Sequence, residues 1–138
     1  MQHHWILSVV LCVVLSGCGD TLNGTKIAEE EVARFHDRMK AKEFDAIYDT
    51  SGKDFQSAVA KPQALALFEA IDRKLGPLTG QRQLDWSIKT YNLVTTVRLV
   101  YESKFKGGTG TETFVFRVNN KTAELIGYNM SSVDMMIK

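Results

Sequence analysis

The spacing of the apolar residues changes after Gly76-Pro77, and this change constrains the fold more than any other feature of the 138-residue chain. Before this point, apolar side chains recur at steps of three and four, as on one face of an amphipathic helix. After it, apolar and polar residues alternate, which predicts strands with one buried face. Helices followed by antiparallel strands define an α+β domain.

The first half of the chain predicts three helices. The first is expected from about residue 26 to residue 42, with Thr25 as its N-cap. A short second helix begins near Phe44 and ends near Ser51-Gly52. The third follows Pro62 and ends at Gly76-Pro77, because glycine permits a left-handed cap and proline cannot continue a helix.

The second half predicts a four-stranded antiparallel meander. The strands are expected at residues 83–89, 96–105, 113–118 and 124–130. A glycine-rich hairpin loop occupies residues 107–110, and Gly127 predicts a bend or bulge inside the last strand. Charged residues alternate with the apolar ones and predict a solvated sheet face with cross-strand ion pairs. These residues are Lys89, Arg98, Glu102, Lys104 and Arg117.

The N-terminal segment has the pattern of an export signal. Residues 5–15 are mainly apolar and uncharged, but a helix needs about 20 such residues to cross a bilayer. The length instead suits the apolar region of a signal peptide, although residues 1–4 lack the usual Lys or Arg. The following Leu15-Ser16-Gly17-Cys18 resembles the lipobox of bacterial lipoprotein precursors.

The lipobox resemblance implies that residues 1–17 are removed and that Cys18 is acylated. Residues 18–25 are then expected to form a polar, lipidated tether, and residues 26–138 a single globular domain. In Gram-negative lipoproteins, Asp directly after the cysteine favours retention in the inner membrane. Gly19 stands there in this chain, so the resemblance implies a lipid anchor in the outer membrane, facing the periplasm.

The order of several short motifs in the domain resembles the cystatin-like or NTF2-like fold, particularly small bacterial domains of unknown function in secreted proteins and lipoproteins. The matching residues are Lys42, Phe44, Asp45, Ala46, Tyr48, Leu75-Gly76, Arg82, Tyr101, Phe105, Glu112-Thr113 and Gly127-Tyr128. The resemblance implies N-terminal helices packed on a curved, mainly four-stranded antiparallel sheet, with a conical pocket between them. Candidate pocket residues are Tyr48, Trp86, Tyr101, Phe116 and Tyr128, whose alternative role is ordinary core packing.

Composition and motifs argue against several function classes. Lys and Arg number 17 and Asp and Glu 16, so the basic stripe of a nucleic-acid-binding protein is missing. The chain after Cys18 has no further cysteine and only one histidine, His36, which is expected to touch solvent or a carboxylate at a helix flank. No metal-ligand spacing, activated nucleophile or glycine-rich nucleotide loop is visible, so no metal or cofactor is expected.

Three functional hypotheses remain. The leading one is a noncatalytic, membrane-tethered envelope lipoprotein that acts as a protein-interaction or binding module. The second is a carrier or sensor of a small apolar ligand held in the pocket. The third follows the isomerases of the NTF2-like fold and would pair Asp45 or Asp85 with Tyr48 or Tyr101. The expected partners are the membrane, through lipid on Cys18, and an envelope protein or a small apolar ligand.

Overall fold

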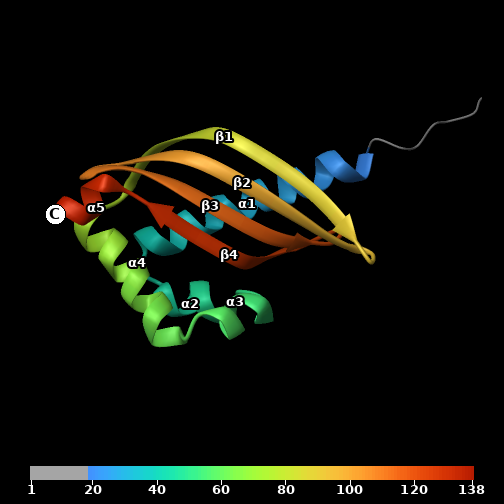
Figure 1. Ribbon diagram of the computed structural model, residues 1–138, viewed down its shortest axis with the longest axis horizontal. Helices are drawn as coiled ribbons and strands as arrows, with labels where there is room; N and C mark the ends of the chain where they lie inside the picture. The colour runs from blue at the N-terminus through green and yellow to red at the C-terminus, as the bar shows by residue number, and fades with distance from the viewer. Residues whose placement is uncertain (1–18) are drawn as a thin grey trace, which may run out of the picture.

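A computed structural model describes residues 19–138 (Figure 1), and the signal segment and Cys18 lie outside the described residues. Four helices come first: α1 (Gly19–Lys40), α2 (Phe44–Asp49), α3 (Lys53–Ala58) and α4 (Lys61–Leu75). Four strands follow: β1 (Leu78–Tyr91), β2 (Val94–Phe105), β3 (Gly108–Val118) and β4 (Ala123–Ser131). The described chain closes with α5 (Val133–Ile137). The predicted α+β class, with N-terminal helices on an antiparallel sheet, is confirmed.

The four strands form one antiparallel sheet in the order β1-β2-β3-β4, so β1 and β4 are its edges. The sheet arches over α1, which contacts all four strands, while α2, α3 and α4 lie together toward the β4 side (Figure 1). The face turned toward α1 is called the inner face here, and the opposite one the outer face. The helices cover the inner face, which therefore holds the core.

The core forms where α1 and α4 meet the inner face. The apolar residues of α1 lie three and four positions apart, so they share one side of the helix and are buried together. The Phe35 ring of α1 packs edge-to-face against Phe114 of β3 and Phe68 of α4, with centroid distances of 5.1 and 5.7 Å. These contacts hold three elements around one aromatic cluster.

The outer face is polar, as predicted. Arg98 Nη1 lies 3.1 Å from Asp85 Oδ2, which joins β2 to β1. Arg117 Nη1 lies 2.7 Å from Glu124 Oε1, which joins β3 to β4. The expected cross-strand ion pairs are therefore present.

The start of the first helix differs from the prediction. The helix begins at Gly19 instead of about residue 26, so residues 19–25 are helical. Thr25 lies inside α1 and is not its N-cap. The reason is tertiary packing. Gly24 is buried beside the Val118 side chain of β3, so contact with the sheet stabilises this polar segment as a helix. The helix α3 was not predicted either, since among its residues Phe55 alone is a large apolar side chain.

Two features of the strands also differ from the simple alternation. A bulge between Gln83 and Asp85 interrupts the pairing of β1 with β2, and Leu84 and Trp86 are 46% and 52% exposed. The expected half-buried strand is therefore mostly exposed. The glycine-rich loop is shorter than predicted, because β3 already begins at Gly108. The predicted irregularity near Gly127 is confirmed, since the β3–β4 register shifts beside it.

Candidate functional site

A cluster of polar side chains lies on the inner face, where Ser103 and Glu112 are buried, His36 and Tyr128 are half-buried, and Gln81 of the edge strand β1 is exposed. Its middle is the fully buried carboxylate of Glu112 on β3. Oε2 accepts hydrogen bonds from Ser103 Oγ at 2.6 Å and from Gln81 Nε2 at 3.3 Å, while Oε1 accepts one from the Tyr128 hydroxyl at 2.6 Å. His36 of α1 completes the cluster, with Nε2 2.9 Å from Glu112 Oε2.

The strand register explains how distant residues meet in this cluster. Gln81 of β1 is paired directly with Ser103 of β2, so both side chains lie on the same face. Glu112 follows Gly110, the β3 partner of Ser103, by two residues and therefore points the same way. His36 is adjacent to Phe35 on α1 and reaches the cluster from the helix side.

Burial and hydrogen bonding act in opposite directions on Glu112. Burial raises the pKa of this carboxyl group, but the hydrogen bond and charge of His36, with the hydroxyl donors of Ser103 and Tyr128, outweigh it. The net pKa of Glu112 therefore lies below its ordinary value, and the group stays ionised. For Tyr128, burial and the neighbouring Glu112 charge raise the pKa well above 10.0. The phenol thus remains a hydrogen-bond donor.

The hollow that reaches His36 is too small for a substrate. A hollow lined by His36, Met39 and Phe105 has a volume of about 20 Å³, enough for roughly one water molecule. Every buried side-chain polar atom in the described part of the chain has a hydrogen-bond partner. The cluster therefore acts as a satisfied polar joint between α1 and the sheet. The prediction that His36 touches solvent or a carboxylate is confirmed.

An open groove of about 320 Å³ lies between α1, α2 and the β3–β4 side of the sheet. Its lining residues combine an apolar floor with a polar rim. The floor is formed by Phe35, Ile47, Phe116 and Leu125, and the rim includes Glu31, Arg38, Thr50, Thr122 and Glu124. Arg38 Nη1 donates a hydrogen bond to Thr50 Oγ1 at 2.9 Å. A groove of this size can hold a small molecule whose apolar part contacts the floor and whose polar groups meet the rim.

The five aromatic residues predicted to line a pocket are not gathered around this groove. Phe116 alone of them lines it. The Tyr48 hydroxyl donates to the backbone oxygens of Gln56 and Val59, and Tyr101 is buried in the core. Tyr128 belongs to the Glu112 cluster, and Trp86 lies half exposed on the edge strand β1. Four of the five residues, all except Trp86, thus belong to the core or pack against it.

The isomerase-like pairs are not assembled within residues 19–138. Asp45 lies 3.0 Å from Lys61 Nζ, and Asp85 binds Arg98 on the outer face. Neither carboxylate is hydrogen-bonded to Tyr48 or Tyr101, because the Tyr48 hydroxyl donates to backbone oxygens and Tyr101 is buried in the core. The described residues also contain no group of three or more His, Cys, Asp or Glu side chains arranged to hold a metal ion.

The sequence interpretation missed Arg38, the cluster members Gln81 and Ser103, and the central position of Glu112 among them. Glu112 carried a detectable signal, because it occupies a position that alternation assigns to the buried face, two residues before Phe114. Arg38 carried none, since a charged residue on a helix flank is usually solvated.

Comparisons with known proteins assign no family to the chain. No protein-family model matches it, and no curated protein matches its sequence. Within residues 19–138, no helix has both the length and the apolar character needed to span a membrane.

Proposed function

We propose that the protein is a lipid-anchored lipoprotein of the cell envelope, in the outer membrane and facing the periplasm, whose domain is a noncatalytic protein-interaction module. The membrane part of the proposal rests on the sequence of residues 5–18, with Cys18 as the acylated residue. The helices on an arched antiparallel sheet support the resemblance to the cystatin-like or NTF2-like fold.

The exposure of Leu84 and Trp86 on β1 is the observation that carries the interaction part. The other large aromatic side chains of the sheet interior are packed, whereas Trp86 leaves 52% of its surface in solvent. Tryptophan is enriched among the residues that dominate protein interfaces. The strand β1 is also a sheet edge of 14 residues, whose outward backbone groups can pair with an added strand. The expected partner is an extended segment of an envelope protein that covers Trp86.

The buried cluster supports a noncatalytic role. Its ionised carboxylate, histidine and hydroxyl groups would be the obvious catalytic set, but they bind one another, and the hollow that His36 lines measures only about 20 Å³. A catalytic group must lie within hydrogen-bond reach of the reacting atom. We therefore assign the residues of the Glu112 cluster a structural role.

Photo-crosslinking in intact cells tests the interaction. A photoreactive phenylalanine replaces Trp86 in one strain and Lys104, an exposed residue of the neighbouring strand, in the matched control. We expect one discrete adduct at position 86 and none at position 104. The purified partner should then bind the full chain, and Leu84→Ser should weaken that binding. Equal labelling at both positions, or no adduct at position 86, would contradict the proposal.

Membrane attachment is tested separately. Cys18→Ala should abolish incorporation of labelled fatty acid and release the protein from the membrane fraction. Retention of the variant in that fraction after signal removal would argue against a lipid anchor.

The groove of about 320 Å³ supports carriage of a small apolar ligand as a second candidate function. Native mass spectrometry of the purified protein should then reveal a bound mass that is lost on denaturation. Thr122→Trp adds a bulky ring at the exposed rim without altering the core, so it should abolish the bound mass. A bare protein mass would leave the interaction module as the supported function.

A further inference from the structure

The turn between β1 and β2 presents apolar side chains to solvent. Tyr91 is 79% exposed, Val94 44% and Leu93 fully exposed. The backbone at Asn92 and Leu93 has positive φ angles of 47° and 64°. Two consecutive left-handed residues are typical of a tight hairpin turn, where Asn-Gly is the favoured pair. We call Tyr91–Val94 the hairpin tip.

Leucine at position 93 gives the fold no visible benefit. Its side chain is fully exposed, so it adds no core packing, and a leucine strains a left-handed backbone that glycine would adopt freely. Both its solvent exposure and its left-handed backbone conformation are therefore unfavourable for a leucine. A binding role accounts for it, because conflicts between local preference and structure are concentrated at functional positions.

The hairpin tip lies at the end of the molecule where α1 begins (Figure 1). Asn23 and Gly24 of α1 line one hollow together with Ile88 and Thr95, which flank the tip on β1 and β2. The helix rises about 1.5 Å per residue, so Gly24 lies roughly 8 Å along the axis from Gly19. Gly19 directly follows Cys18 in the sequence, so a lipid on Cys18 would enter the membrane close to the tip.

We propose that the hairpin tip inserts into the lipid surface to which the protein is anchored, an inference that rests on the proposed acylation of Cys18. Leu93 enters the boundary of the acyl chains, and the Tyr91 ring lies at the headgroup level, which tyrosine favours. Lys121 lines a hollow with Leu93 and, like Lys89, is exposed at this end, so both ammonium groups can meet phosphate headgroups. The anchor keeps the tip at high effective concentration, so a small apolar contact is sufficient.

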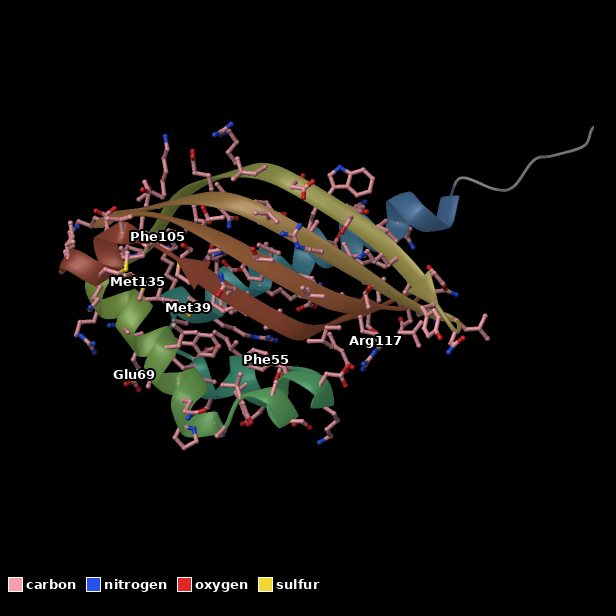
Figure 2. The ribbon with its side chains drawn as sticks, in the orientation of Figure 1. Met39, Phe55, Glu69, Phe105, Arg117 and Met135 are labelled. Atoms are coloured by element: carbon pink, nitrogen blue, oxygen red, sulfur yellow. The ribbon has the colours of Figure 1, made fainter. Side chains whose placement is uncertain are left out.

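The test places an environment-sensitive fluorophore at the tip of the full, acylated protein. Leu93→Cys provides the only free thiol, because Cys12 lies in the segment predicted to be removed and the Cys18 thiol carries lipid. Glu69→Cys is the matched control, on the exposed side of α4 and far from the tip (Figure 2). Both proteins are reconstituted in vesicles of phosphatidylethanolamine and phosphatidylglycerol, some containing spin-labelled lipid as a quencher.

We expect blue-shifted emission at position 93 and quenching by spin-labelled lipid several times stronger than at position 69. Adding Tyr91→Ser should reduce the quenching at position 93, which a fluorophore that inserted by itself would not do. Equal emission and quenching at positions 93 and 69, in protein that floats with the vesicles, would overturn the proposal for the tip. Protein that lacks the acyl mass and does not float would instead refute the anchor, and with it the membrane contact that depends on it.

Discussion

The Nε2 atom of His36 lies 2.9 Å from Oε2 of Glu112, where α1 crosses the sheet. Beside this pair, the Phe35 ring packs edge-to-face on Phe114. Two consecutive residues of α1 thus contact β3 two positions apart: Phe35 makes an apolar contact and His36 a polar one. Because the polar contact is directional, it specifies the placement of the helix over the strands more narrowly than apolar packing alone.

Glu112→Gln should destabilise the fold by about 2–4 kcal/mol. The reason is that the NH₂ group of the glutamine would face hydrogen-bond donors, where the carboxylate oxygens of Glu112 accept hydrogen bonds. The measurement is the free energy of unfolding from urea denaturation. Glu102→Gln is the matched control, since Glu102 makes an exposed ion pair with Arg82 worth at most about 1 kcal/mol. Equal costs for the two variants would contradict the role assigned to the cluster.

Lowering the pH should reduce the folding stability by protonating Glu112. Its pKa is lowered in the folded state from the ordinary 4.5, so its contribution to stability is present above 4.5 and is lost as the pH falls through the folded value. Melting temperatures recorded from neutral to acid pH should fall most steeply in that window. Glu112→Gln should flatten this part of the curve, and an unchanged slope would show that other carboxylates cause it.

Raising the pH should reduce the folding stability by deprotonating Tyr101. Burial, with a smaller effect of the Glu29 charge, raises the pKa of this phenol from 10.0 to about 12. The stability that it contributes is present below pH 10.0 and is lost as the pH rises toward about 12. Phenolate absorbance should therefore show a late phase that coincides with unfolding and is diminished in Tyr101→Phe. A late phase of unchanged amplitude would contradict this assignment.

Leu93→Gly should stabilise the isolated protein in solution by about 0.5–1 kcal/mol, because relief of the left-handed strain exceeds the added entropy of the unfolded chain. Thermal unfolding without lipid gives the measurement. Leu93→Ala, which keeps a Cβ atom and hence the strain, should have a smaller effect. A glycine variant less stable than the parent would show that Leu93 supports the fold.

The helices and strands follow from local patterns, but several positions depend on contacts that the patterns do not contain. The end of α4 at Leu75 could be predicted, since Gly76-Pro77 stops a helix by its own backbone chemistry. The start of α1 could not, because residues 20–25 are helical against the ends of distant strands. The exposure of Trp86 also depends on a bulge whose position is set by pairing with β2.

The candidate site was less predictable for the same reason. The alternation along β2 and β3 places Ser103 and Glu112 on the inner face, so a buried polar pair was detectable in principle. Their meeting with His36 depends on where α1 crosses the sheet, which no spacing within one segment reveals. The groove near Arg38 likewise arises between three elements.

The distance along β1 between the hairpin tip and Trp86 has a consequence for the partner. Trp86 lies five positions before Tyr91, and a strand rises about 3.3 Å per residue, so the two positions are roughly 17 Å apart. With the tip in the lipid, Trp86 would stand at no more than this height above the bilayer. Under the two proposals, a protein that covers Trp86 would have to approach the membrane this closely, which would favour partners bound to the same membrane surface over partners that diffuse freely in the periplasm.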